Sequence, residues 1–411
     1  MSAAVESFER HEAPGRPRRL LASLAERAEQ RERGLLAALL LLAFGARLWL
    51  CFGAGLEWLT PDSHNYLRMA AAMAAGSPFG LFPNGYPMLV AAVGALAGEA
   101  TLPALIAVNA VASTATVWLV HRLARTLTDR ALPALLAALG AALLPNQLVY
   151  VHYVLTEPTA TLLLTAGLLV LCRGHSGTGG ALLAVACAFR SSLVPVLLLA
   201  AAALAWRAAD PSAWRRFSAG AAAVGVAYAA LCGAGVVVPG NNAGSNLLIA
   251  VGSPSSALSY APDGFDAEQR RHPLRTYVLS AVEHPGRFAW QRTSALWELW
   301  GPYPTEVERS LPARLLLGLR LPLLLLALLA LVRHRRRLEV LLLATPCISV
   351  TAVHVALFAT PRFSYPAEPA LLALASLSLW DRYGPGPRAD HGSSGSEERA
   401  LETHLAHPAQ P

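Results

Sequence analysis

Long apolar runs are the feature that most restricts how this chain can fold. Residues 34–56 read GLLAALLLLAFGARLWLCFGAGL, and several later runs have a similar length. About 20 such residues are needed to cross the hydrocarbon of a bilayer as a helix. An ordinary soluble domain is about 25% charged, whereas this chain of 411 residues is 14% charged. The sequence therefore predicts an all-α, multi-pass membrane protein.

The charges of the chain lie mainly at the ends of these runs. The chain contains no lysine, so its 33 Lys and Arg positions are all arginine, and its formal net charge is +7. Short basic loops stay in the cytoplasm when a membrane protein inserts. The basic runs HRLARTLTDR and RHRRR therefore indicate topology and not nucleic-acid binding. Exclusive use of arginine, with abundant alanine and leucine, is typical of a GC-rich bacterial genome and favours a bacterial plasma membrane.

The same rule divides the chain into three parts. Residues 1–33 are expected to form a cytoplasmic segment, and residues 34–382 a bundle of about 8–10 transmembrane segments. The tail 383–411 is rich in Gly, Ser, Pro and charge, which is typical of disorder. No cleavable signal peptide is expected, because the first apolar run follows 33 mostly polar residues. The outer loops are expected at about 57–100, 150–156, 239–312 and 360–364.

One apolar stretch conflicts with the topology expected from the basic loops unless it turns back within the membrane. Residues 181–206 lie between two basic segments that are both expected in the cytoplasm. A broken hairpin turning near Arg190 satisfies the rule, provided that protein or water covers the irregular backbone. A cation at this depth is a functional candidate in need of an anion. A phosphate suits its paired donors, and Glu157 is an equally good partner.

The first outer loop carries a carboxylate at an expected helix start. Thr60 and Pro61 are favoured at the N-cap and first helical positions, which places Asp62 in the first turn of a membrane-surface helix. There Asp62 is either a capping acid stabilised by the helix dipole or a base for a hydroxyl arriving from the aqueous side. The following apolar stretch is too short to span, and it suits a second interfacial helix with Tyr86 at its entrance.

Further polar side chains fall in the remaining outer loops. Glu157 lies at the mouth of the span that begins there, where an acid is costly unless it is solvated or paired. The segment 240–246 is rich in Gly and Asn and is expected to be a turn-rich loop. The amides of Asn242 and Asn246 suit hydrogen bonds to hydroxyl or phosphate groups, although a plain surface loop explains the segment equally well.

Seven motifs in one order resemble a known family. They are PDSHNYLRMA, NGYPMLV, LTEPTATLLL, AFRSSLVPVLLL, NNAGSNLLIAVGSPSSA, EHPGRFAWQRTSALWELWGP and PRFSYPAEPALLALAS. Their order is similar to that in membrane glycosyltransferases of the GT-C fold, notably those related to protein mannosyltransferases and the lipid A aminoarabinose transferase. The resemblance covers about residues 35–380 and implies a GT-C-like helical bundle with amphipathic interfacial helices in its first outer loop.

The resemblance also implies a reaction and a set of site residues. The reaction is transfer of a sugar, with inversion, from a polyprenyl-phosphate carrier to an acceptor on the non-cytoplasmic side of the bilayer. The resemblance makes Asp62 the catalytic base, and Glu157 is the second catalytic candidate. Residues expected to bind the donor or substrate are Tyr86, His152, Arg190, Asn242, Asn246 and Arg362.

The sequence leaves alternatives open for the metal cofactor, for the acceptor and for the functional class of the protein. Many relatives have two adjacent acids in the first loop, whereas Ser63 follows Asp62 here, so an acidic pair for a divalent metal is not supported and no metal ligand is assigned. The acceptor can be a glycan, a lipid or a protein. A lipid or solute transporter would place polar residues through the span midplanes and on both faces. The expected spans are nearly uncharged, which favours the transferase over a transporter; a non-catalytic scaffold of cell-envelope assembly is the third reading.

Overall fold

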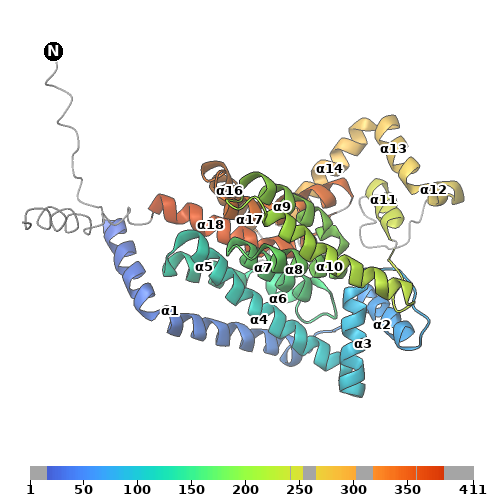
Figure 1. Cartoon of the computed structure of the whole chain (residues 1–411), viewed down its shortest axis with the longest axis horizontal. Coiled ribbons are helices and arrows are strands. Elements are labelled where there is room, and N and C mark those ends of the chain that lie inside the picture. Colours follow the sequence, from blue (N-terminus) through green and yellow to red (C-terminus); the bar gives the residue numbers. More distant parts are fainter. Residues whose placement is uncertain (1–15, 241, 253–264, 302–317, 358, 384–411) are drawn as a thin grey trace, which may run out of the picture.

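A computed structural model of the chain describes residues 16–240, 242–252, 265–301, 318–357 and 359–383. Over these residues the secondary structure is helical and contains no strand. Figure 1 shows a central bundle with helix α1 along one side and helices α12–α14 projecting from the other. The expected disordered tail falls almost entirely outside the described residues, as do the first 15 residues of the expected cytoplasmic segment.

The N-terminal half forms the following elements. They are α1 Arg16–Leu48 with a π-helical end Trp49–Gly53, α2 Pro61–Ala74, α3 Gly85–Ala97, a 3-10 turn Gly98–Ala100, α4 Thr101–Thr128, α5 Ala131–Leu143, α6 Pro145–Val149 and α7 Glu157–Cys172. Helix α1 begins well before the apolar run, so much of the expected cytoplasmic segment is helical. Helices α2 and α3 occupy the first outer loop at the two places where interfacial helices were predicted.

The C-terminal half continues the bundle and adds the projecting arm. Its elements are α8 Ser176–Phe189, a 3-10 turn Ser191–Leu193, α9 Val194–Arg207, α10 Ala213–Gly233, α11 Ala243–Val251, α12 Ala267–Arg271, α13 Pro273–Glu283, α14 Pro285–Trp300, α16 Arg320–Arg333, α17 Leu338–Ala356, the 3-10 segment η5 Pro361–Ala367 and α18 Glu368–Tyr383. The long loop expected at 239–312 is therefore largely helical where it is described.

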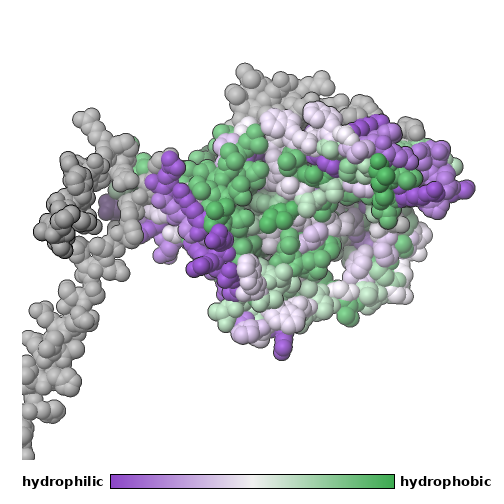
Figure 2. All heavy atoms as spheres, turned by 90° about the horizontal axis from the view of Figure 1, so that it is seen from above, coloured by the Kyte–Doolittle hydropathy of each residue, from purple (hydrophilic) through white to green (hydrophobic). Residues whose placement is uncertain are grey.

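Several helices have the length and surface of membrane spans. Within the described ranges, four are long and apolar enough to cross a bilayer: Leu20–Gly53, Gly85–Thr128, Ala213–Gly233 and Leu338–Ala356. Shorter apolar helices, among them α5 and α7, accompany them. Large apolar side chains such as Leu41, Leu198, Val226 and Leu325 are exposed on the outside of the bundle, and Figure 2 shows hydrophobic side chains over the middle of the visible face. The prediction of an all-α polytopic membrane protein is confirmed for the described residues.

The apolar stretch 181–206 breaks where the arginine pattern predicted. Arg190 adopts an extended conformation between α8 and α9. Helix α8 packs mainly against α7 and α10, whereas α9 packs mainly against α17. Helices α8 and α10 approach so closely that a Cβ on Gly180 or on Gly220 would overlap a backbone carbonyl of the facing helix. The approach therefore depends on glycine at both positions. Small residues at helix interfaces allow this backbone contact within membranes.

The arginine-rich helix ends gather at one end of the bundle. There Arg337 donates to the backbone oxygen of Leu127, Arg125 pairs with Glu29, and His334 pairs with Asp381 of α18. The opposite end carries the starts of α2 and α7, the break at Arg190, the start of α11 and segment η5. The bundle therefore has one basic end and one end where the candidate residues lie.

Two expectations from the sequence were wrong, one about the segment 240–246 and one about charges within the spans. The segment 240–246 is not simply a turn-rich loop, because α11 begins at Ala243; the apolar run that follows it favours a helix over a loop. The spans are also less free of charge than expected. Arg47, Arg320 and Glu368 are fully buried in helices of the bundle, where hydrogen bonds to protein groups offset the cost of removing them from water.

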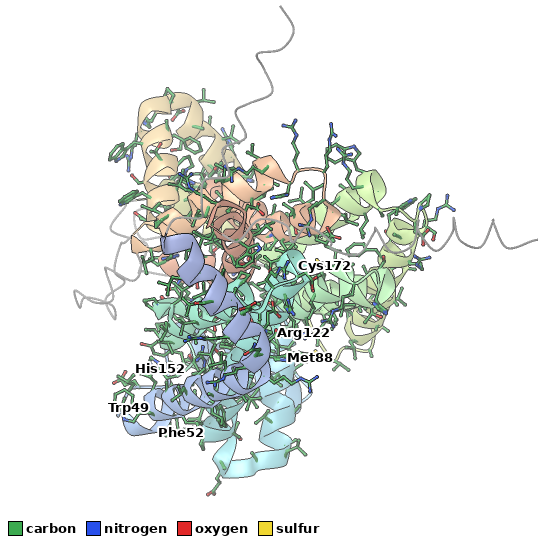
Figure 3. All side chains as sticks on the ribbon, turned by 90° about the vertical axis from the view of Figure 1, so that its left-hand side faces the viewer. Trp49, Phe52, Met88, Arg122, His152 and Cys172 are labelled. Atoms are coloured by element: carbon green, nitrogen blue, oxygen red, sulfur yellow. The ribbon has the colours of Figure 1, made fainter. Side chains whose placement is uncertain are left out.

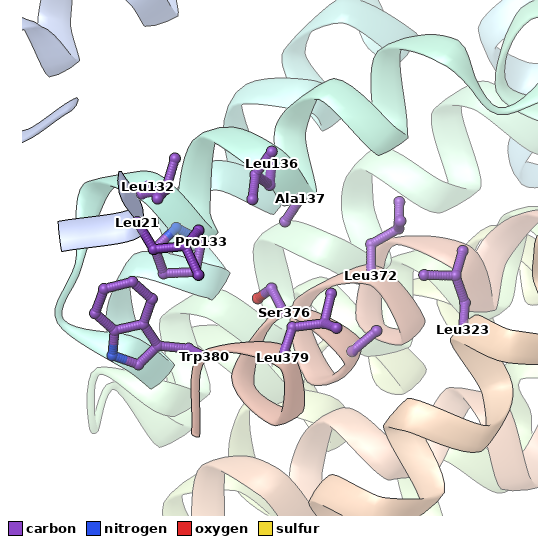
Figure 4. A pocket seen from close by; sticks show the side chains of 11 residues that line it. Leu21, Leu132, Pro133, Leu136, Ala137, Leu323, Leu372, Ser376, Leu379 and Trp380 are labelled. Carbon is purple, nitrogen blue, oxygen red and sulfur yellow. The ribbon is translucent and has the colours of Figure 1, made fainter. Parts of the chain in front are cut away.

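An apolar cavity lies between the helices near the basic end (Figure 4). Its volume is about 280 Å³, and it is formed by α1, α5, α16 and α18. The side chains around it are Leu21, Leu132, Pro133, Leu136, Ala137, Leu323, Leu372, Ala375, Ser376, Leu379 and Trp380. A lining with a single hydroxyl, one indole and no charge offers no group for acid–base chemistry, whereas the ionisable candidate residues lie at the opposite end of the bundle.

Candidate active site

The start of α2 fixes the position of Asp62. The hydroxyl of Thr60 accepts a hydrogen bond from the backbone N–H of Ser63, and the Ser63 hydroxyl accepts one from the backbone N–H of Thr60. This reciprocal capping box, with Pro61 at the first helical position, satisfies two donors that a helix start leaves unpaired. Ser63 therefore caps the helix, while Asp62 turns toward the interior and is 5% exposed.

Asp62 lies on the wall of a cavity of about 500 Å³ at this end of the bundle. Residues from α2, α8, α9, α11, α17 and η5 line it, together with the loops that join them. The polar and charged lining residues are Asp62, Tyr66, Thr156, Arg190, Ser191, Ser192, Asn242, Asn246, His354 and Arg362. The volume falls within the range of small-molecule sites, which combine mostly apolar walls with a few placed polar groups.

Two carboxylates and two guanidinium groups form a continuous chain at this wall. Arg362 donates from Nη1 to Oδ2 of Asp62 at 2.8 Å and from Nε to Oε1 of Glu157. Arg190 donates from Nη1 to the same Glu157 oxygen at 2.8 Å. Glu157 is fully buried beneath the two arginines, so two positive groups offset the cost of burying its charge. The sequence left open whether Arg190 would face Glu157 or a phosphate, and the structure shows the pair with Glu157.

An aromatic ring separates the two guanidinium groups. The centre of the Phe363 ring lies 5.2 Å from the guanidinium carbon of Arg190 and 6.0 Å from that of Arg362. His354 stacks on the same ring, with 4.3 Å between the ring centres. Cations near an aromatic face are stabilised by the ring quadrupole, so Phe363 helps to hold both arginines at the cavity wall.

A buried polar cluster anchors the segment that carries Arg362. The amide of Asn146 donates to the backbone oxygen of Pro361 and to Glu368, both at 2.8 Å. Glu368 also accepts from Gln147 at 3.0 Å and lies 3.3 Å from Nε of Arg320. All four polar side chains are at most 1% exposed. Segment η5 is thus tied to α6, α16 and α18 on one side and presents Arg362 to the cavity on the other.

Replacing Asn146 tests this anchoring. In Asn146→Ala, Glu368 and the Pro361 carbonyl each lose a buried donor, at a cost of about 1–3 kcal/mol. We expect a lower melting temperature and reduced binding of a lipid phosphate, because the backbone beside Arg362 is no longer fixed. Asn65→Ala, at a half-buried position of α2 whose amide oxygen accepts from the exposed Arg68 of the same helix, is the matched control and should change neither. Wild-type phosphate binding in a destabilised Asn146→Ala protein would limit the cluster to stability.

The far wall of the cavity is built by a close backbone contact. A Cβ on Gly240 would overlap the backbone carbonyl of Phe82, so only glycine allows the chain before α11 to lie against the first outer loop. Asn84 fastens the same contact by donating to the Val238 carbonyl and to the Tyr228 hydroxyl, both at 2.8 Å. These contacts bring α11, with Asn246, to the cavity opposite Arg190 and Arg362.

Two of the predicted binding residues lie behind the cavity wall. Tyr86 is fully buried and makes an edge contact with Tyr66, with 5.1 Å between ring centres. His152, labelled in Figure 3, is buried in the loop between α6 and α7 beside Tyr153. Burial lowers the pKa of His152 to about 4, so its imidazole is uncharged at neutral pH. Neither residue lines the cavity, and Tyr86 packs against Tyr66, which does.

The carboxylates do not form a metal site. Among the residues that the structure describes, no group of three or more His, Cys, Asp or Glu side chains could hold a metal ion. Asp62 and Glu157 instead share one guanidinium group, which would compete with a cation for their oxygens. The arrangement of these donors therefore does not fit a divalent metal.

Two ionisable residues that line the cavity, Tyr66 and His354, were not predicted from the sequence. Tyr66 lies one helical turn after Asp62, and residues four apart share a face; burial raises its pKa well above the usual value, so its phenol stays protonated and can donate. His354 is a lone ionisable residue in the last turn of an apolar helix. Such residues are functional candidates by default, so both signals were present in the sequence.

Comparisons with known proteins found likenesses of fold only. No family model and no curated protein matches the chain. A crystal structure of ArnT from Cupriavidus metallidurans bound to undecaprenyl phosphate is 16% identical and covers 90% of this chain, with a TM-score of 0.48. ArnT from the same organism in the apo state is 15% identical and covers 87%, with the same TM-score. This chain spans 63% and 62% of those two chains.

Proposed function

We propose that the chain is a membrane glycosyltransferase that moves a sugar from a polyprenyl-phosphate carrier to an acceptor hydroxyl or amine. The observation that carries the proposal is the single cavity in which the carboxylate of Asp62 faces the guanidinium groups of Arg190 and Arg362. The Asp62 carboxylate is a base for the acceptor, and the guanidinium groups of Arg190 and Arg362 are paired hydrogen-bond donors for the phosphate.

The remaining walls of the cavity suit the carrier. Val194, Pro195, Leu247, Val353 and Leu357 give it an apolar side next to the arginines. A polyprenyl phosphate has a hydrocarbon tail directly joined to an anionic head. Apolar side chains beside guanidinium groups match both parts, whereas a free sugar nucleotide would place polar groups against the apolar side.

The reaction needs one base and no general acid. The acceptor O–H or N–H gives its proton to Asp62, and the acceptor lone pair forms the new bond to the anomeric carbon from the face opposite the phosphate. The bond from that carbon to the phosphate oxygen breaks with its electron pair on oxygen, which inverts the anomeric centre. The lipid phosphate gains one negative charge, and Arg190 and Arg362 stabilise it as it develops.

Orientation can be tested by labelling single cysteines at the two ends of the bundle. The positive-inside rule places the basic end in the cytoplasm and the cavity outside it. In a chain whose native cysteines are replaced, Ser245→Cys on α11 should react with an impermeant maleimide added to intact cells. Arg336→Cys, exposed at the basic end, should react only after permeabilisation. The reverse pattern would invert the topology and reject an extracytoplasmic site.

The buried charges bear on the transporter alternative. Arg47 lies inside a span, but it donates to the Ser113 hydroxyl at 2.8 Å and to the Ala43 carbonyl at 3.0 Å. Such contacts fix helices together, and Arg47, Arg320 and Glu368 do not line the described 500 Å³ cavity. Mass spectrometry of glycolipids and cell-wall glycans from cells lacking this gene decides between the classes. A missing sugar on an extracytoplasmic glycan supports the transferase, whereas accumulation of an unmodified substrate on one side only indicates transport.

A further inference from the structure

Asp62 is held in the site by a group that the donor also needs. Its Oδ2 accepts the 2.8 Å hydrogen bond from Arg362, while its buried Oδ1 accepts none from any described residue. A guanidinium stabilises a carboxylate in its charged form. The hydrogen bond occupies Oδ2 and ties the carboxylate to Arg362, so the Asp62–Arg362 pair opposes the approach of an acceptor proton to that oxygen.

The charges at the cavity wall are balanced before any ligand binds. Asp62 and Glu157 carry two negative charges, and Arg190 and Arg362 carry two positive charges. A phosphodiester brings one more negative charge than these two guanidinium groups balance, so it competes with the carboxylates for them. Glu157 is fully buried and bound by both arginines, whereas Asp62 is bound by one. The free-energy cost of losing an arginine partner is therefore lower for Asp62 than for Glu157.

Arg362 is also the guanidinium better placed to change partners. Its side chain is 17% exposed, against 9% for Arg190, and it lines the cavity. Its backbone stays fixed because Asn146 holds the preceding carbonyl of Pro361. Asp62 belongs to α2, a separate element. A rotation of the Arg362 side chain is thus enough to exchange Asp62 for a phosphate without unfolding either segment.

We propose that the donor phosphate and Asp62 compete for Arg362, so that binding of the donor releases Asp62 to accept the proton of the acceptor. The inference rests on the proposed function and adds an order to it: the donor binds before the acceptor becomes reactive. Arg362 is then both a phosphate ligand and the group that holds the base until the donor is present.

The test measures binding of farnesyl phosphate, a short polyprenyl phosphate, to the full chain in detergent. Asp62→Asn removes the competing charge, so we expect its affinity to rise by about fivefold or more, the lower end of typical coupling between two sites. Glu268→Gln, an exposed acid on α12 of the described arm, removes the same charge elsewhere and should leave the affinity unchanged.

Two further measurements separate competition from simple charge repulsion. At about 1 M NaCl the screening length falls to about 3 Å, so a gain due to long-range repulsion should vanish and a gain due to exchange at Arg362 should remain. In an Arg362→Gln background, Asp62→Asn should give no gain, because the contested group is gone; this double-mutant cycle isolates the pairwise effect. The salt experiment needs no change at Arg362 and so remains decisive if that variant does not fold.

The outcomes distinguish this inference from the function on which it rests. Equal or weaker binding by Asp62→Asn, or a gain that disappears in salt, overturns the competition. A gain of the same size in the Arg362→Gln background does so as well. If Asp62→Asn loses transfer but binds the phosphate no more tightly, the glycosyltransferase proposal stands and the exchange at Arg362 is rejected.

Discussion

Asp62→Asn is expected to lower transfer by about 10²–10⁴-fold, the usual contribution of a positioned base. Asparagine keeps the size of the side chain and an oxygen that can still accept from Arg362, but it cannot take the acceptor proton. Arg362 also keeps its contact with Glu157. We therefore expect normal insertion and a melting temperature within about 4 °C of the wild type, since about 1 kcal/mol shifts a chain of this size by about 2–4 °C.

The measurement is the rate of sugar transfer from purified lipid-linked donors to membrane extracts, normalised to the amount of folded protein. Glu268→Gln, an exposed acid of the described outer arm, is the charge-matched control and should transfer at the wild-type rate. Full activity in Asp62→Asn would remove Asp62 from the mechanism. Glu157 would then be the next base to test, although two guanidinium groups hold it.

Local sequence rules predicted the elements that depend on neighbouring residues. Thr60 and Pro61 marked the start of α2 and so placed Asp62 in its first turn. The arginine pattern located the break at Arg190, because topology is set by charges next to the spans. In both cases the information lies within a few residues of the feature, and the structure agrees with the sequence.

Contacts between distant parts of the chain were beyond the reach of these rules. Asn146 and Glu368 are 222 positions apart, and the residues next to either one do not indicate that the two side chains will be in contact. The same holds for Asp62 and Arg362, which are 300 positions apart. The resemblance to a family suggested a common cavity, whereas the ion pairs within it follow only from the packing of α2, α7 and η5.

The start of α11 shows how a local rule can be outweighed. Glycine and asparagine in 240–246 favour turns, and the expectation of a loop followed from them. The apolar residues Leu247 and Leu248 that follow pack into the wall beside the cavity, and burial stabilises the helix from Ala243 onward. Most helical stability in proteins comes from such packing and not from propensity.

The second large effect is expected at Arg190, whose guanidinium lies between Glu157 and the cavity. Arg190→Ala removes a charge-assisted hydrogen bond from buried Glu157, at a cost of about 1.5–3 kcal/mol in stability; Arg362 remains as a partner and keeps the loss from being larger. The same change removes a donor for the phosphate, so farnesyl phosphate should bind about tenfold or more weakly. Transfer should fall further, because the leaving phosphate gains charge in the reaction.

A double-mutant cycle with Glu157→Gln separates the two roles of Arg190. If the arginine only balances Glu157, the double variant regains the stability lost in Arg190→Ala, and phosphate affinity stays near the wild type throughout. If it binds the donor, stability recovers in the double variant but phosphate affinity does not. Arg190→Lys sharpens the distinction, because lysine keeps the charge and loses the paired planar donors. We expect it to remain folded and to transfer slowly, and wild-type transfer by Arg190→Lys would contradict a bidentate contact with the donor phosphate.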